Sequence, residues 1–146
     1  MTSDFSTLYP EVVFAHTRKP RNYFALERAI TAEGNNPLCG DQLVVYLTLD
    51  KGVVTQLTFL GSCCAIATAS ASIMTVYVQG KTVPEAEELF ERFRRLVEGD
   101  EDTHSDDLGE LKAFRSLHDH PQRVSCALLP WRTLLEAIRK ATITGM

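Results

Sequence analysis

The segment LVVYLTLDKGVVTQLTF, residues 43–59, decides the fold. Its first half alternates between two sides, and its second half places Val53, Leu57 and Phe59 on one face. Strict alternation is typical of a strand that is buried on one side. Asp50-Lys51-Gly52 between the halves is a short turn in which glycine can adopt positive φ. The segment therefore predicts an antiparallel hairpin, with Leu43, Val45, Leu47 and Leu49 pointing one way and Val44, Tyr46 and Thr48 the other.

Two helices are expected after the hairpin. Residues 65–78 are rich in Ala, Ser and Ile, and such small side chains let a helix lie close against a sheet before Gly80 ends it. Thr82 and Glu85 then form the pattern of a capping box with Pro84 inside the first turn. The helix that they open carries one apolar stripe and stops at Gly99; the stripe consists of Ala86, Leu89, Phe90, Phe93 and Val97.

Before the hairpin, the apolar spacing over Leu8 to His16 suits one face of a helix that Pro20 ends. A short strand is expected around Glu27 to Thr31. The loop Gly34-Asn35-Asn36-Pro37 then leads into Cys39.

The C-terminal part begins with an acidic, polar loop from Gly99 to Asp107, followed by a short helix from Leu108 to Leu117. The segment Pro121 to Cys126 returns toward the core. The last helix is expected from about Leu128, which places Pro130 in its first turn and Cys126 at or just before its start.

The bulk properties are those of one globular domain covering residues 1–146, with 45% hydrophobic and 23% charged residues. The net charge of −4 argues against a nucleic-acid partner, which would require a basic face, and against an anionic membrane. The N-terminus has neither a basic start nor an apolar run, so no signal peptide is expected. We therefore expect a cytoplasmic protein, in which thiols stay reduced.

Cysteines in such a setting indicate a metal site, a reactive thiol or plain packing. Cys39, Cys64 and Cys126 are each expected at the end of an element, where side chains can converge outside the packed core. A helix N-terminus also favours the thiolate that binds metal. Gly40 lets Asp41 turn toward the same point as Cys39, and a carboxylate is a known zinc ligand beside thiolates. Spacing alone leaves a convergent metal site and buried packing thiols equally open.

Three ordered motifs carry a resemblance to a known family. They are Asn36-Pro37-Leu38-Cys39-Gly40-Asp41, Phe59-Leu60-Gly61-Ser62-Cys63-Cys64-Ala65-Ile66 with Ala69-Ser70-Ala71-Ser72, and Arg123-Val124-Ser125-Cys126-Ala127. The chain resembles the IscU/SufU/NifU N-terminal family of iron–sulfur cluster assembly proteins from about Leu8 to Ile138, and its SufU-like branch in particular. The resemblance implies an α+β fold of the SufE/NifU-like type, a small three-stranded antiparallel sheet packed against about five helices.

The resemblance also implies one metal site at Cys39, Asp41, Cys64 and Cys126. In SufU-like members that site holds zinc, and the cysteine matching Cys39 accepts sulfur from a PLP-dependent, SufS-like cysteine desulfurase for a downstream scaffold or apo-protein. In IscU-like members the same cysteines carry a nascent [2Fe–2S] cluster. Ser125, where IscU-like members have His, and a family-specific insertion around residues 98–116 favour the SufU-like alternative.

The sequence departs from the family at Cys63, where the family has Gly, and at Ala67, where it has Ser. If the glycine position needs positive φ, Cys63 is strained. Cys63 could also compete as a ligand, although Cys64 is the residue that aligns with the motif.

Overall fold

The computed structural model describes residues 11–100 and 106–144. The elements follow one another as β1 (Ile30–Asn36), β2 (Asp41–Asp50), β3 (Val53–Ser62), α2 (Ala65–Val78), α3 (Val83–Val97), the 3₁₀ helix η1 (Asp106–Asp119) and α4 (Pro121–Thr144). A further helix covers residues 11–18 and precedes them. This is the predicted α+β fold, in which a three-stranded antiparallel sheet packs against five helices among the described residues.

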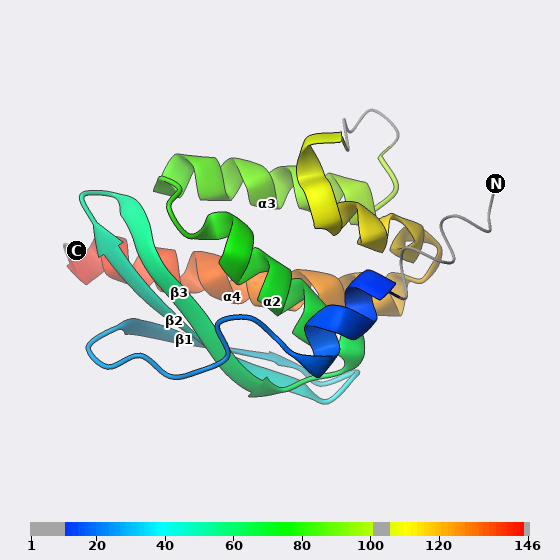
Figure 1. The fold of residues 1–146 in the computed structure, drawn as a ribbon, viewed down its shortest axis with the longest axis horizontal. Helices are drawn as coiled ribbons and strands as arrows, with labels where there is room; N and C mark the ends of the chain where they lie inside the picture. Colours follow the sequence, from blue (N-terminus) through cyan, green and yellow to red (C-terminus); the bar gives the residue numbers. More distant parts are fainter. Residues whose placement is uncertain (1–10, 101–105, 145–146) are drawn as a thin grey trace.

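The elements form layers, with the sheet on one side, α2 and α4 across its inner face, and α3 with η1 beyond them (Figure 1). Aromatic rings join the outer layers, because Phe93 of α3 packs 5.7 Å from Phe114 of η1 and 5.3 Å from Trp131 of α4, measured between ring centroids. No helix among the described residues is long and apolar enough to span a membrane.

The predicted hairpin is confirmed, with Leu43, Val45 and Leu47 buried along β2. Its second strand differs in one detail. The register shifts between Thr48 and Leu49, so Val54 rather than Val53 joins the buried face. An extra residue at a bulge reverses the alternation on one strand, which a strict period of two does not predict.

The first strand lies further along the chain than predicted. It begins at Ile30 rather than Glu27 and continues through residues 34–36, which were expected in a loop. Gly34 pairs with Leu43 in the ladder, and a Cβ at this position would overlap the Thr133 hydroxyl of α4. Glycine is therefore required by the close approach of a helix, not by a turn.

The last helix begins at Pro121, seven residues before the predicted start at Leu128. Cys126 therefore lies inside α4 instead of at its start, and Pro130 lies in the helix interior instead of the first turn. Proline suits the first position of a helix because it has no N–H to lose there, so Pro121 was the start signal. The prediction instead placed the start near Pro130, because proline is usually excluded from the interior of a helix.

The remaining elements agree closely with expectation. Helix α2 covers the predicted residues, and α3 begins with the predicted capping box of Thr82 and Glu85. The helix expected from Leu108 is a longer 3₁₀ helix, kinked at Gly109. The first helix ends at residue 18, before Pro20, whereas its predicted start at Leu8 and most of the predicted acidic loop lie outside the described residues.

Candidate metal centre

Four side chains from three separate parts of the chain converge at one end of the sheet. Cys39 lies in the turn between β1 and β2, Asp41 is the first residue of β2, Cys64 precedes α2 and Cys126 lies in α4. One ligand atom each from Cys39, Asp41 and Cys126 lie within 4.8 Å of one another. The Cys64 Sγ lies 3.7 Å from Asp41 Oδ2. The fold thus brings Cys39, Asp41 and Cys126 into one compact group, although Cys39 and Cys126 are 87 residues apart, and Cys64 adjoins this group through Asp41 without belonging to it.

The turn that carries Cys39 is shaped by Asn36. The Asn36 carbonyl accepts hydrogen bonds from the N–H groups of Cys39 (3.2 Å) and Gly40 (2.8 Å), and its side-chain Oδ1 accepts one from Leu38 N–H (3.2 Å). Its Nδ2 also lies 3.9 Å from the Cys126 Sγ, to which it donates. Asn36 was not among the site residues predicted from the sequence, although an asparagine followed by Pro37 is a signal for a side-chain-capped turn.

Asp41 is a buried carboxylate, only 1% exposed. Its Oδ1 accepts a 2.7 Å hydrogen bond from the Cys64 N–H, and its Oδ2 lies on the side of the Cys64 thiol. No Lys, Arg or His among the described residues forms an ion pair with it. Burying an unpaired carboxylate is costly, so this environment favours a bound cation.

Cys64 lies at the end of an element, as predicted, and is the N-cap of α2. Its backbone is extended, with φ −65° and ψ 168°, and its Sγ accepts a hydrogen bond from the Ala67 N–H at 3.5 Å. Unpaired N–H groups at a helix start favour negative charge on a nearby side chain. The Cys64 sulfur therefore lies at the N-terminal end of α2, beside the Asp41 carboxylate.

Cys126 is in a different environment from the one predicted. It lies in the second turn of α4 and is fully buried, so burial raises the pKa of its thiol far above the ordinary range. Its Sγ donates to the Cys39 Sγ at 3.0 Å. Pro130 offers no N–H to the Cys126 carbonyl, and the Ser70 hydroxyl of α2 donates to the neighbouring Ala127 carbonyl at 2.6 Å.

The three thiols differ in accessibility. Cys39 is exposed, Cys64 is half-buried and Cys126 is buried. Cys39 is therefore the thiol of this group that a partner can approach most directly.

Cys63 is engaged elsewhere. Its thiol donates to the Gln42 carbonyl at 3.3 Å, and burial, reinforced by the charge of Asp41, raises its pKa to about 11. It is not one of the described non-glycine residues with positive φ, so the strain considered from the sequence is absent. Cys63 thus keeps its proton near neutral pH.

The donor set fits zinc. Thiolate sulfur and carboxylate oxygen are both zinc ligands, and a tetrahedron with Zn–S bonds of about 2.3 Å places neighbouring ligand atoms about 3.7 Å apart. The 3.7 Å between Cys64 Sγ and Asp41 Oδ2 matches that spacing, whereas the Cys39 and Cys126 sulfur atoms, 3.0 Å apart, would have to separate by about 0.7 Å to bind the same zinc ion. Three thiols also suit iron, so the donor set alone does not select one metal.

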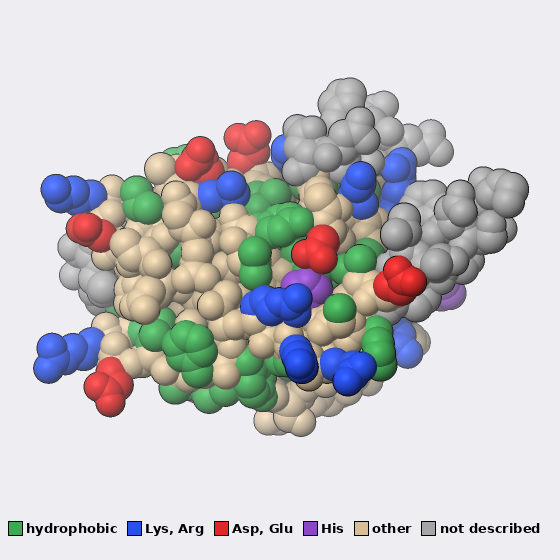
Figure 2. Space-filling model, viewed as in Figure 1, with side chains coloured by type: hydrophobic (Ala, Val, Ile, Leu, Met, Phe, Trp, Pro, Cys, Tyr) green, Lys and Arg blue, Asp and Glu red, His purple; other side chains and the backbone are tan. Residues whose placement is uncertain are grey.

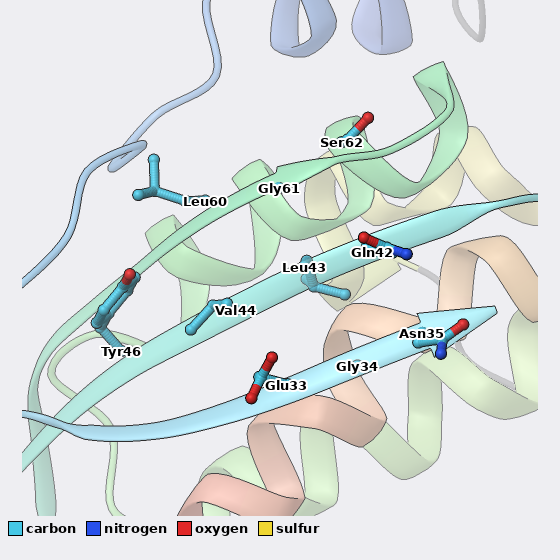
Figure 3. Close-up of a pocket in the computed structure, with 10 residues that line it drawn as sticks. All are labelled: Glu33, Gly34, Asn35, Gln42, Leu43, Val44, Tyr46, Leu60, Gly61 and Ser62. Atoms are coloured by element: carbon cyan, nitrogen blue, oxygen red, sulfur yellow. The ribbon is translucent and has the colours of Figure 1, made fainter.

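A separate groove crosses the outer face of the sheet beside the centre (Figure 3). It has a volume of about 630 Å³ and is lined mainly by backbone, amide, hydroxyl and aliphatic groups from all three strands, with Glu33 as its one charged residue. Gln42 and Ser62 mark its end nearest the metal centre. The thiols are not part of its lining.

Comparison with known proteins gives consistent relatives. The family model of the NifU-like N terminal domain matches residues 8–127. The zinc-dependent sulfurtransferase SufU of Bacillus subtilis is 35% identical over 138 residues, covering 94% of each chain. The iron–sulfur cluster assembly scaffold protein IscU of Streptococcus pyogenes is 34% identical over 139 residues, covering 95% of this chain and 87% of that one.

A solved structure agrees with these sequence relatives. FiSufU from the thermophile Fervidobacterium islandicum AW-1 superposes with a TM-score of 0.81 at 32% identity, covering 88% of this chain and 94% of that one. Sequence and fold therefore agree that this chain belongs to the family of the NifU-like N terminal domain.

Proposed function

We propose that this protein takes part in iron–sulfur cluster assembly as a zinc-dependent sulfur acceptor, with Cys39 as the accepting thiol. Zinc would be held by Cys39, Asp41, Cys64 and Cys126. The observation that carries the proposal is an exposed thiol, Cys39, within a cluster of two further thiols and a buried carboxylate. The name of the Bacillus subtilis relative, a zinc-dependent sulfurtransferase, supports the same assignment.

The donor that we propose is a PLP-dependent, SufS-like cysteine desulfurase carrying a persulfide on its own cysteine. The Cys39 thiolate attacks the terminal sulfur of that persulfide. One S–S bond breaks at the desulfurase and one forms at Cys39, and the desulfurase leaves as a thiolate. The exchange moves a sulfur atom without net oxidation or reduction, so no further reactant is required.

The chain's own residues prepare this step. Bound zinc supplies the positive charge that keeps the site's thiols deprotonated at neutral pH. The Asn36-capped turn presents Cys39 at the surface, while Asp41 fixes the start of α2 through the Cys64 N–H. Cys126 lies behind Cys39 in the core, where water has little access.

A second candidate function is a scaffold on which a [2Fe–2S] cluster is assembled and transferred. Three convergent thiols favour it, because iron–sulfur clusters are bound mainly by cysteine. The Streptococcus pyogenes relative carries the name of such a scaffold. The two candidates differ in colour, since a zinc protein is colourless and a cluster absorbs visible light.

The wider setting of the proposal is a cytoplasmic protein that hands sulfur to a downstream scaffold or apo-protein. We regard residues 1–146 as one domain in which residues 98–116 form the insertion of the SufU-like branch. Its described part belongs largely to η1, which packs on α3 and α4.

The test is the turnover of the cysteine desulfurase with and without this protein. Cys39→Ser should abolish the stimulation, because a thiolate is the nucleophile in this exchange and a serine hydroxyl stays protonated near neutral pH. Cys63→Ser is the matched control and should stimulate like the wild type. Stimulation by Cys39→Ser equal to that of the wild type would show that Cys39 is not the acceptor.

A further inference from the structure

A basic patch surrounds an exposed aromatic ring at the end of the first helix. Phe14 is 59% exposed, and Arg18, Lys19 and Arg21 are exposed around it. Together with Ala15 and Pro20 they line a surface hollow of about 650 Å³. Lys and Arg side chains gather over this helix and the turn after it (Figure 2). We name Phe14, Arg18, Lys19 and Arg21 the basic patch.

The basic patch is attached firmly to the element that begins at the metal centre. The Thr17 hydroxyl donates to the carbonyl of Ala65 at 3.1 Å, and Ala65 directly follows Cys64. The Arg21 N–H donates to the buried Ser72 hydroxyl of α2 at 2.8 Å. A partner on this patch would therefore lie beside the start of α2, where the thiols converge.

No described carboxylate forms an ion pair with a cation of the basic patch. Among the described residues none of Arg18, Lys19 and Arg21 forms an ion pair; Arg18 lies 5.2 Å over the Phe14 ring, and Arg21 donates to the Lys19 carbonyl. The carboxylate of Glu110 is bound to His16 instead. These three cations, which form no ion pair among the described residues, lie within residues 18–21 and make this surface basic, although the chain as a whole has a net charge of −4.

We infer that the basic patch is a docking surface for an acidic segment of the sulfur donor, one that carries carboxylates beside an apolar side chain. Guanidinium groups pair with carboxylates, and the exposed ring of Phe14 offers apolar contact at the centre. A second exposed apolar side chain, Leu38 at 84%, directly precedes the accepting Cys39. The inference rests on the proposed function and names the surface that brings the donor to Cys39.

The experiment titrates the zinc-loaded protein into the cysteine desulfurase of the same organism and measures both the half-saturating concentration and the maximal stimulation. For Arg18→Glu with Lys19→Glu, the half-saturating concentration should rise about tenfold at low salt, because charge complementarity mainly governs encounter. Added salt should reduce the difference in half-saturating concentration between this variant and the wild type, since salt screens exposed charges. Phe14→Ala should raise the half-saturating concentration at every salt concentration.

The matched control is Lys51→Glu with Arg132→Glu, which changes the net charge equally at exposed positions outside the basic patch. This control should behave like the wild type. If the patch variant and the control shift equally, or if neither shifts, the patch is not the docking surface. Loss of stimulation by the wild type itself would instead overturn the proposed function.

A membrane is the competing partner for a basic patch with an exposed ring. Vesicles containing phosphatidylglycerol test it directly. Binding of wild-type protein to these vesicles, lost in the Arg18 and Lys19 variant while desulfurase stimulation is unchanged, would contradict the inference.

Discussion

Asp41 combines two interactions that a single substitution can separate. One carboxylate oxygen accepts the Cys64 N–H, and the other faces the Cys64 thiol. Asp41→Asn keeps a hydrogen-bond acceptor but removes the charge, whereas Asp41→Ala removes both. We expect both variants to bind zinc more weakly in competition with a chromophoric chelator. Only Asp41→Ala should also destabilise the metal-free protein, by about 1–3 kcal/mol in urea unfolding, because the half-buried Cys64 N–H loses its partner.

The two variants also show whether Asp41 is a zinc ligand or only caps the start of α2. Zinc affinity of Asp41→Asn equal to that of the wild type would mean that Asp41 only caps the start of α2. Asn36 could not be predicted as a site residue, because its role depends on the folded turn. There its carbonyl and its side chain together accept hydrogen bonds from three N–H groups.

At the scale of elements, the contact between β1 and α4 depends on Gly34. A Cβ there would overlap the Thr133 hydroxyl and come within 3.1 Å of Leu43. Gly34→Ala should lower the free energy of unfolding by about 1–3 kcal/mol, because overpacking forces the helix off the strand. Urea unfolding of the single variant measures this loss.

A compensating substitution makes the prediction specific. Thr133→Ala in the Gly34→Ala background should recover part of the loss, since it removes the overlapping hydroxyl. No recovery would show that the cost arises from the strand backbone and not from the contact with α4.

Three elements are tied together by His16, which is buried. Its Nδ1 lies 2.7 Å from the Ser72 hydroxyl of α2, and its Nε2 lies 3.2 Å from the Glu110 carboxylate of η1. The carboxylate can only accept, so Nε2 donates to Glu110. Ser72 and His16 are both buried, so the group ties the first helix to α2 and η1 from inside the core.

We expect His16→Ala to lower the free energy of unfolding by about 2–3 kcal/mol, because a cavity forms and the buried hydroxyl loses a partner. Glu110→Gln is the matched variant on the other side of the bond. It should cost less than about 1 kcal/mol, because that carboxylate is 46% exposed. Equal losses in urea unfolding would contradict a tie centred on Ser72.

For the whole molecule, the candidate metal centre connects the β1–β2 turn, the start of α2 and the second turn of α4. A ligand that binds only the folded state stabilises it by about 4 kcal/mol at a free concentration 1,000 times its Kd. Removing zinc with a chelator should therefore lower the melting temperature of the wild type and of Cys63→Ser alike. Cys64→Ser should show a much smaller change, because it lacks a ligand.

The two neighbouring cysteines thus provide the control for each other. A chelator-dependent melting temperature that persists in Cys64→Ser and disappears in Cys63→Ser would assign the ligand to Cys63. It would contradict the geometry in which Cys63 is bound to the Gln42 carbonyl.

Much of the fold was predictable from local patterns. The hairpin, α2 and the capping box of α3 follow from alternation, small residues and Thr82 with Glu85, all of which act within a few residues. The predicted start of α4 was wrong because Pro130 lies in the interior of this helix. Packing of Trp131 against α2 and α3 offsets the backbone hydrogen bond that Pro130 cannot donate. The loop expected at Gly34 was wrong because glycine there serves the approach of a helix.

Motifs and periodicities are properties of neighbouring residues, so they were enough to predict the α+β architecture, the family and the four residues expected at the metal site. Long-range packing was needed to show that Cys126 lies buried within a helix, that Cys39 is the exposed thiol and that Asp41 accepts a hydrogen bond from the Cys64 N–H. It also placed a basic patch beside the start of α2. Burial and distance between residues far apart in sequence arise from the packing of all elements together, which no local pattern records.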